Sequence, residues 1–407
     1  MSGVLFRYYY LVIFGFYFLN VFYESIRPGV LASAFIIMLS LTVVPSNATR
    51  LELLINLYVF YNIFGILLNF QNDIPLRIGF EEFSSSALPV MFFFIARRFG
   101  SQSEKFYQSF LFACFLCYGT GMFWYLELPP YYVEYLTRLQ LRFSIDGYLL
   151  DKRFFSFLGS TSIGLFAPIS ALVAFYLLFV TRQFRYLAMA LLSVVISLLS
   201  YHRASYVMIL FVMIFVHIKF LKNRFSAIIV GWELVFLAAV VISLDSSGIG
   251  TLEDIRTVFV RLDSAVSSRS DQWLTVTRLG LRIVFGNGLG SMSHRAVEYS
   301  TALVNDGGYF KLLGELGLVG FGLFLLVLLA TANIIFNKRC LGSVSLEACI
   351  ILLFLIQSIG SNGLFFQDSA PLFWIAIGFI SSREQVMCQG VVRSGWRRWP
   401  AGAALSK

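Results

Sequence analysis

The chain has 407 residues, of which 58% are hydrophobic and 13% are charged, and its mean hydropathy is +0.79. A soluble protein carries about 25% charged residues, so the composition excludes an ordinary soluble enzyme and indicates a polytopic membrane protein. The formal net charge of +9 does not indicate nucleic-acid binding, because the basic residues lie in short loops between apolar stretches, where they orient a protein in the bilayer.

Apolar stretches follow one another along most of the chain, and twelve of them reach or approach the length of about 20 residues that crosses a bilayer. They begin near Tyr8, Val30, Leu51, Ser86, Phe106, Phe157, Tyr186, Ala204, Ser226, Leu312, Val344 and Pro371. The fourth and the twelfth are the shortest. The sequence therefore predicts an all-α polytopic membrane protein with about 12 transmembrane helices.

Charge in the connecting loops predicts the topology. Lysine and arginine follow the fourth, sixth, eighth and tenth stretches and recur in the tail, whereas the alternate loops hold Glu24, Asp73, Glu81 and Glu82. The positive-inside rule then places both termini in the cytoplasm and the two longest polar segments outside. We expect transmembrane spans over 1–126, an outer loop over 127–156, spans over 157–244, a large outer loop over 245–307, spans over 308–382 and a cytoplasmic tail over 383–407.

Both outer loops are expected to be partly helical. In the first, Arg138 and Arg142 lie four residues apart on an amphipathic stretch rich in tyrosine, so they share one helical face. In the second, Thr251-Leu-Glu-Asp254 has the form of a capping box, which starts a helix. A further helix is predicted from Ser270 onward.

The large outer loop carries six arginines: Arg256, Arg261, Arg269, Arg278, Arg282 and Arg295. On its second predicted helix, Asp271, Arg278 and Arg282 share one face. The planar guanidinium of arginine suits phosphate and carboxylate, so the first hypothesis is an anionic substrate handled at the membrane surface. The alternative is a solvated loop whose arginines form ion pairs with acidic neighbours.

Glycines interrupt this loop in the segment Gly286-Asn-Gly288-Leu-Gly290. The segment is not a phosphate-binding loop of the Walker type, because it lacks the Gly-Lys-Ser/Thr ending. We interpret it as a flexible turn, with exposed backbone amides that hold a phosphate as the alternative. No Asp-x-Asp pair occurs and the three histidines are scattered, so neither a metal ion nor another cofactor is expected.

Two further polar residues stand at predicted membrane boundaries. Arg203 lies where the seventh span turns into the eighth, a position that is costly for arginine unless it snorkels, pairs or contacts a substrate. Asp306 stands at the mouth of the tenth span, as a helix N-cap or as a catalytic carboxylate. The glycines of Gly317-Leu-Val-Gly320, which follow, allow a neighbouring helix to approach closely.

Several of these segments occur together in one order: Arg153 with Gly164 eleven residues later, Arg203 at the start of a span, Ser268-Arg269 with Trp273, the segment 285–290, and the stretch 306–320. Together they resemble the bacterial O-antigen polymerase and ligase superfamily, over roughly 153–324. Arg153-x10-Gly164 and Arg269-x10-Gly280 both resemble the paired Arg-x10-Gly motif of O-antigen polymerases. The ligase branch carries a histidine eleven residues before Gly317, where this chain has Asp306, and this difference favours a polymerase.

The resemblance implies a glycosyltransferase of GT-C-like architecture, with its active site at the periplasmic face of the bacterial inner membrane. Its substrates would be a donor and an acceptor glycan on undecaprenyl pyrophosphate, and its partners membrane lipids, a chain-length regulator and a repeat-unit flippase. Arg203 and Arg269 are assigned to the pyrophosphate and Asp306 to proton transfer, without metal or cofactor. The expected wider anion contacts are Arg142, Arg153, Arg278 and Arg282.

Two other functions stay open at this stage. One is an O-antigen ligase that transfers polysaccharide to lipid A-core. The other is a transporter or flippase for a lipid-linked anionic glycan, which twelve spans would fit equally well. Transporters place charges and broken helices near the middle of the membrane. In this sequence the charges gather on one side, with Glu233 as the chief exception.

Overall fold

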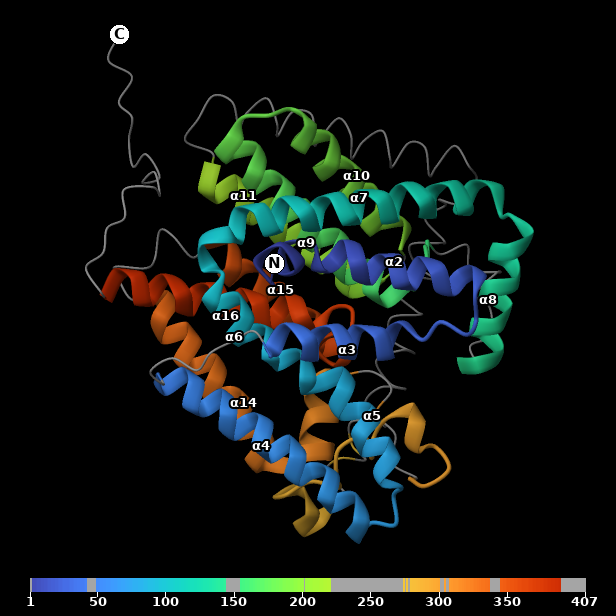
Figure 1. Cartoon of the computed structure of the whole chain (residues 1–407), viewed down its shortest axis with the longest axis vertical. Helices are drawn as coiled ribbons and strands as arrows, with labels where there is room; N and C mark the ends of the chain where they lie inside the picture. Colours follow the sequence, from blue (N-terminus) through green and yellow to red (C-terminus); the bar gives the residue numbers. More distant parts are fainter. Residues whose placement is uncertain are drawn as a thin grey trace.

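The computed structural model describes residues 2–41, 49–143, 154–200, 202–220, 274, 276, 279–300, 304, 307–336 and 345–388. Within these residues every regular element is a helix, and there is no strand (Figure 1). The α-helices are α1 (Ser2–Arg7), α2 (Tyr9–Phe22), α3 (Pro28–Ser40), α4 (Arg50–Gln71), α5 (Leu76–Ser86), α6 (Met91–Arg98), α7 (Ser103–Glu127), α8 (Pro130–Phe143), α9 (Ser160–Thr181), α10 (Arg185–Leu199), α11 (Arg203–Phe220), α14 (Gly308–Phe336), α15 (Ser345–Gly360) and α16 (Ala370–Cys388). Short 3-10 turns are η1 (Leu88–Val90), η2 (Gly100–Gln102), η3 (Gly280–Ile283), η4 (His294–Ala296) and η5 (Gly363–Phe365).

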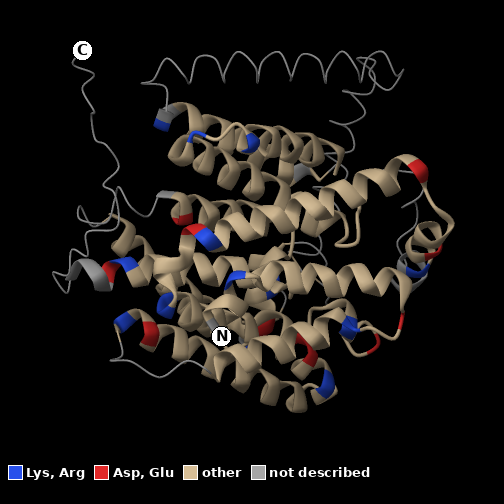
Figure 2. Cartoon of the chain, turned by 45° about the horizontal axis from the view of Figure 1, so that its top comes forward, with Lys and Arg blue, Asp and Glu red and all other residues tan. Residues whose placement is uncertain are grey.

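Five helical stretches are long and apolar enough to cross a membrane, and shorter apolar helices accompany them. The five are Arg50–Gln71, Leu76–Arg98, Gly100–Glu127, Ser160–Thr181 and Gly308–Phe336. Charged residues lie mostly near the helix ends, which leaves the helix middles apolar (Figure 2). The chain is therefore a helical membrane protein.

Each predicted apolar stretch overlaps a described helix, except for the one that begins near Ser226, which lies outside the described residues. Several of these helices are shorter than a membrane span. The predicted capping box at 251–254 also lies outside them. The predicted helix from Ser270 falls there too, apart from Leu274 and Val276, which are helical, and its last residues, which form η3. The amphipathic stretch of the first outer loop forms α8. At the other end of the chain, α16 continues to Cys388, past the boundary predicted at 382.

The predicted loop at Glu81 and Glu82, before the fourth span, is wrong, because both residues lie on a helix. The span was expected to begin near Ser86, with Glu81 and Glu82 in an outer loop. The structure instead places both glutamates on α5, within the continuous apolar stretch Leu76–Arg98. Pro89 interrupts this stretch at η1, since proline donates no backbone hydrogen bond. Two adjacent charges concealed the span, because hydropathy alone does not reveal that Glu82 is paired.

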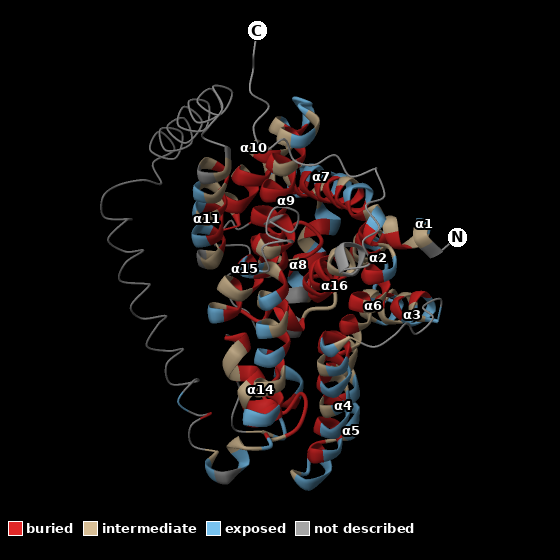
Figure 3. Ribbon diagram, turned by 90° about the vertical axis from the view of Figure 1, so that its left-hand side faces the viewer, coloured by how far each residue is buried: buried red, intermediate tan, exposed pale blue. Residues whose placement is uncertain are grey.

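The core lies around α9, which contacts α7, α10, α11 and α15. In its most apolar window 83% of the residues are buried, against 28% in α14. Small residues along α9 let its neighbours approach closely, and Ser170 accepts from or donates to Tyr118 of α7 at 2.9 Å and donates to Ser193 of α10 at 2.9 Å. By contrast α4, α5 and α14 extend together beyond the rest of the bundle (Figure 3).

Candidate functional site

A cluster of buried charges joins α5 to the first two turns of α14. Glu82, Lys311 and Glu315 are all buried. The Lys311 ammonium lies 2.5 Å from Glu82 Oε1 and 3.9 Å from Glu315 Oε1. Ionisable residues inside an apolar helix are costly and occur where they pair or serve a function. We call these three residues, together with Arg295, the charge cluster.

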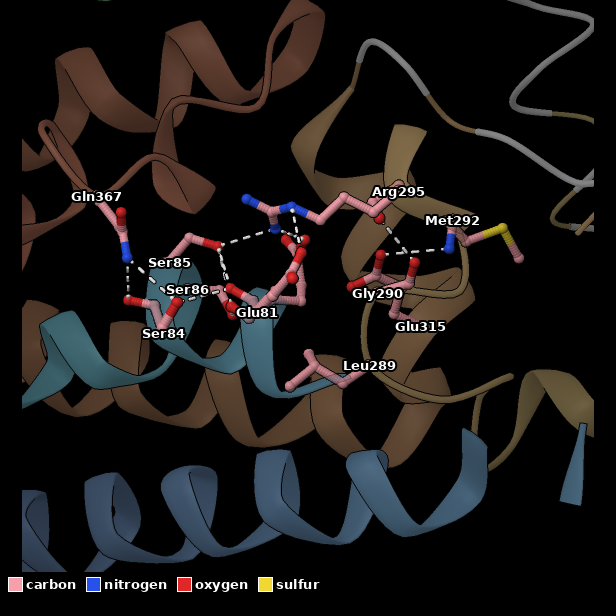
Figure 4. Close-up of polar contacts among 12 residues, drawn as sticks. Glu81, Ser84, Ser85, Ser86, Leu289, Gly290, Met292, Arg295, Glu315 and Gln367 are labelled. Carbon is pink, nitrogen blue, oxygen red and sulfur yellow. Dashed lines mark hydrogen bonds and ion pairs between the residues drawn. The ribbon is translucent and has the colours of Figure 1, made fainter. Parts of the chain in front are cut away.

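Arg295 connects the charge cluster to the solvent side. Its Nη1 lies 2.8 Å from Glu82 Oε2 and donates to Ser85 Oγ at 3.4 Å, while its Nε lies 3.6 Å from Glu81 Oε2 (Figure 4). The Arg295 side chain is 44% exposed, whereas that of Glu82 is 2% exposed. Glu82 therefore binds one cation through each oxygen, Lys311 from the inside and Arg295 from the outside.

The turn after α15 packs against this cluster. The Lys311 ammonium lies 4.9 Å from the centre of the Phe365 ring, a cation–π contact. Gln367 donates to Ser33 Oγ of α3 at 2.9 Å and to the Ser84 carbonyl of α5 at 3.1 Å (Figure 4). Residues 361–369, which we call the α15–α16 turn, thus join α3, α5 and α14.

Asp368 is a buried carboxyl group in the α15–α16 turn. Burial raises the pKa of Asp368 to about 6, which hydrogen bonds from Ser162 and from the amides of Asp368 and Ser369 only partly offset. Ser162 lies in the first turn of α9 and Ser369 directly precedes α16, so the carboxyl group sits at two helix N-termini, where negative charge is favourable.

The helix α14 is broken at Gly317, whose φ of 65° and ψ of −170° are not helical. In a continuous helix the carbonyls of Gly314 and Glu315 would accept from the amides four residues later. Here they accept from Asn287 at 2.9 Å and Gly288 at 3.0 Å instead. The amide of Val319, freed by the same break, donates to the Val284 carbonyl at 3.2 Å.

The other side of the segment 284–290 packs on α4. Tyr61 donates to the Phe285 carbonyl at 3.0 Å, Asn72 to the Asn287 carbonyl at 3.0 Å, and Asn69 to the Leu289 carbonyl at 2.8 Å. These donors lie on one face of α4. The glycine-rich segment is therefore fixed between α4 and α14, and it repairs the hydrogen bonding of the broken helix.

Glycine is required where the backbones meet. A Cβ atom on Gly286 would lie 2.2 Å from the Glu315 carbonyl oxygen, and one on Gly288 would lie 2.0 Å from Asn69 Oδ1. Both residues have positive φ, 90° and 103°, where other residues are strained. On Gly317 a Cβ atom would lie 2.4 Å from the Gly286 amide nitrogen.

Both sequence interpretations of the segment 286–290 are therefore wrong. It is not a flexible turn, because α4 and α14 hold it on both sides. Nor are its amides exposed to a phosphate: Gly286 donates to the Arg282 carbonyl, Leu289 to Gly65, and Gly290 to the Glu315 carboxylate. The reason lies in the distant break of α14, whose unpaired carbonyls need donors.

The predicted site residues are only partly placed. Arg153, Arg269, Arg278 and Asp306 lie outside the described residues. Arg142 belongs to α8 and Arg203 begins α11, but their side chains are not among those described. Arg282 lies in η3 and is exposed.

Residues next to three of these positions lie in one region. Phe154, which follows Arg153, donates through its amide to the Leu199 carbonyl at the end of α10, at 3.0 Å. His202, which precedes Arg203, packs against Gly164 of α9, where a Cβ atom would lie 2.7 Å from His202 Cβ. The starts of α9 and α11 are thus adjacent.

The start of α14 lies in the same region. Gln357 at the end of α15 donates to the Thr161 carbonyl of α9 at 3.3 Å. Gly308, the first residue of α14 and two positions after Asp306, donates to the Ser361 carbonyl at 3.0 Å. The α15–α16 turn therefore links the starts of α9 and α14.

The sequence did not indicate the charge cluster as a site. Lys311 and Glu315, four residues apart in an otherwise apolar helix, were the available signal, because such a pair shares one helical face. Their partner on α5 was not predictable, since it is distant in sequence and was assigned to a loop. Compared with protein-family models and with curated proteins, the chain matches none. Function is therefore inferred from this geometry and from the resemblance of its segments.

Proposed function

We propose that the protein is an O-antigen or surface polysaccharide polymerase. It joins oligosaccharide repeat units carried on undecaprenyl pyrophosphate, at the periplasmic face of the bacterial inner membrane. In this proposal the chain has about 12 transmembrane helices and a GT-C-like architecture. The lipid carriers explain why the enzyme is embedded in a membrane.

One observation carries the proposal: segments that resemble the polymerase family, far apart in sequence, lie around one turn. Phe154, beside Arg153, binds the end of α10, and His202, beside Arg203, packs against Gly164 of α9. The end of α15 binds the start of α9 through Gln357, and Ser361 of the α15–α16 turn binds Gly308, two residues after Asp306. Glycine-rich segments 286–290 and 317–320, which also belong to the resemblance, form one structural unit next to it. Such convergence is expected of a site and not of unrelated loops.

The proposed reaction is a displacement at the anomeric carbon of the donor. A hydroxyl oxygen of the acceptor sugar forms the new glycosidic bond, and the bond from the anomeric carbon to the pyrophosphate oxygen breaks. Arg203 and Arg269 stabilise the charge that develops on the leaving undecaprenyl pyrophosphate. Asp306 accepts the proton of the hydroxyl. Arg142, Arg153, Arg278 and Arg282 provide wider anion contacts, and neither metal nor cofactor takes part.

Deletion of the gene and electrophoresis of the surface polysaccharide tests this proposal. We expect single repeat units on lipid A-core in place of long chains. Naked lipid A-core would identify a ligase instead. The purified protein should also lengthen lipid-linked repeat units in excess EDTA. Activity that requires magnesium or manganese would contradict the metal-independent mechanism.

The charge cluster favours a second candidate, a transporter for a lipid-linked anionic glycan. Its residues lie on broken helices, α5 before Pro89 and α14 at Gly317, and buried charges on broken helices are typical of transporters. Proteoliposomes separate the two functions. A polymerase lengthens lipid-linked glycan in the bilayer, whereas a flippase moves unchanged glycan from one leaflet to the other.

A further inference from the structure

Glu315 holds the glycine-rich segment through two different groups. Its backbone carbonyl accepts from the Gly288 amide at 3.0 Å. Its carboxylate accepts from the amides of Gly290 and Met292, the latter at 3.3 Å (Figure 4). One fully buried residue of α14 therefore binds three amides of this segment.

These contacts extend toward the predicted catalytic carboxylate. The carbonyl of Met292 accepts from the amide of Val304 at 3.0 Å, and Val304 lies two residues before Asp306. On the other side of the segment, the Gly286 amide donates to the Arg282 carbonyl at 2.7 Å. The residues that flank the glycine-rich segment are thus tied to it by direct backbone bonds.

The burial of Glu315 costs folding free energy, and a purely structural role does not explain this cost. It is fully buried, and its Oε2 has no hydrogen-bond partner among the described residues. Within the part of the chain that the structure describes, Glu315 forms an ion pair with Lys311, which lies 3.9 Å away and is bound more closely to Glu82. A buried carboxylate with an unsatisfied oxygen destabilises the fold, so a role beyond stability explains its presence.

We propose that Glu315 is a positioning residue that, through Met292, sets the position of Val304, the last described residue before Asp306 in the sequence. The Glu82–Lys311 pair fixes the start of α14 against α5, and Glu315 then transmits this position to residues 288–292 and, through Met292, to Val304. The inference rests on the proposed function for its catalytic consequence, but its structural part does not.

A cysteine pair measures the structural part directly. Phe285 and Leu318 are exposed residues on the two sides of the contact, where Gly317 meets the Phe285 backbone. We would replace both with cysteine in the full chain and measure, in membranes, how fast a short thiol cross-linker joins them. Mass spectrometry of the linked peptide distinguishes this product from reactions of the native cysteines.

Variants at Glu315 separate position from charge. Glu315→Leu removes the acceptor for both amides, so we expect cross-linking roughly tenfold slower, together with loss of long polysaccharide. Glu315→Gln keeps a carbonyl oxygen as acceptor, so it should retain most of the cross-linking rate and most of the long polysaccharide. Glu347→Leu, the matched control, removes a buried carboxylate far from the segment, so its cross-linking should match the parent even if less protein reaches the membrane.

Cross-linking at the parental rate in Glu315→Leu would overturn the proposal. If Glu315→Leu is cross-linked slowly but still makes polysaccharide of normal length, the proposed consequence for catalysis by Asp306 is wrong. If Glu315→Leu does not reach the membrane, Glu315→Asp gives the same test, because its shorter carboxylate keeps the charge near Lys311 but does not reach both amides. If the parent makes no polysaccharide, the proposed function fails, while the cross-linking series still decides the positioning role.

Discussion

Buried ion pairs occur at both ends of the helices, and they are built differently. At the end that carries the N-terminus of α15, Glu347 binds Arg383 through two hydrogen bonds of 2.6 and 2.7 Å. At the opposite end, Glu82 is shared by Lys311 and Arg295, and Glu315 has an unsatisfied oxygen.

The difference shows what each set of charges stabilises. In a bidentate arginine–carboxylate pair each partner makes two hydrogen bonds, and Glu347 and Arg383 join the start of α15 to α16. The charge cluster includes a carboxylate that also binds backbone amides of a loop. Closed pairs therefore hold helices together, whereas the open cluster holds a segment that leads to predicted functional residues.

Removal of one charge should have the largest effect. Lys311→Met leaves Glu82 and Glu315 buried without their ammonium, and breaking a buried pair costs about 3–5 kcal/mol. Arg383→Met should cost about as much. In the Arg383→Met variant, the second substitution Glu347→Gln should restore the stability. In the Lys311→Met variant, the second substitution Glu82→Gln should restore it only in part, because Glu315 remains a buried charge without a partner. Thermal unfolding in detergent checks this; equal restoration at both ends would contradict the comparison.

The second effect is a pH dependence at Asp368. Burial raises its pKa from 3.8 to about 6, so the folded state favours the protonated form. The contribution of Asp368 to the free energy of unfolding is then fully present below about pH 4. It is lost as the pH rises through about 6, and the loss is roughly 3 kcal/mol in total. Asp368→Asn stays neutral and should lose less stability than the parent between pH 4 and 7. The melting temperature of each protein, measured at several pH values, checks this. An equal change of melting temperature with pH in both proteins would show that the pKa of Asp368 is not raised.

Glycine substitutions should have an intermediate effect. Gly288→Ala forces a Cβ atom into Asn69 at a φ of 103°, and such backbone strain costs about 1–3 kcal/mol. Gly322→Ala is the matched control in α14, where a Cβ atom meets nothing within 4 Å. Alanine is the better helix former by roughly 0.5–1 kcal/mol, so this variant should be as stable as the parent or more stable. Similar melting temperatures for both variants would show that the glycine-rich segment is not tightly packed.

The smallest effects are expected at the exposed edge of the charge cluster. Arg295 is 44% exposed, so solvent screening reduces the contribution of its pairs and Arg295→Ala should cost about 1 kcal/mol. Arg77 pairs with Glu81 four residues away and is 83% exposed, so Arg77→Ala should cost less than about 0.5 kcal/mol. A larger loss for Arg77→Ala than for Arg295→Ala would reverse the order that burial predicts.

Most helices of the fold could be predicted from the sequence, because apolar stretches of membrane length have few alternatives in a bilayer. The prediction failed at α5, where Glu81 and Glu82 read as a loop. Hydropathy treats each residue alone, whereas Glu82 is tolerated because Lys311, more than two hundred residues later, neutralises it. The candidate site was predicted less well: several arginines, Arg295 among them, and Asp306 were selected from the sequence, but Glu82, Lys311 and Glu315 were not.

The sequence by itself determined that this is a helical membrane protein, where most of its described helices lie, and which segments resemble a polymerase. Local properties suffice for these conclusions, since helix formation and membrane burial depend on the residues within one stretch. Only the tertiary structure decided what the two glycine-rich segments do. Each is ambiguous alone, and their roles follow from hydrogen bonds between them: the break at Gly317 leaves carbonyls unpaired, and the amides of Asn287 and Gly288 satisfy them.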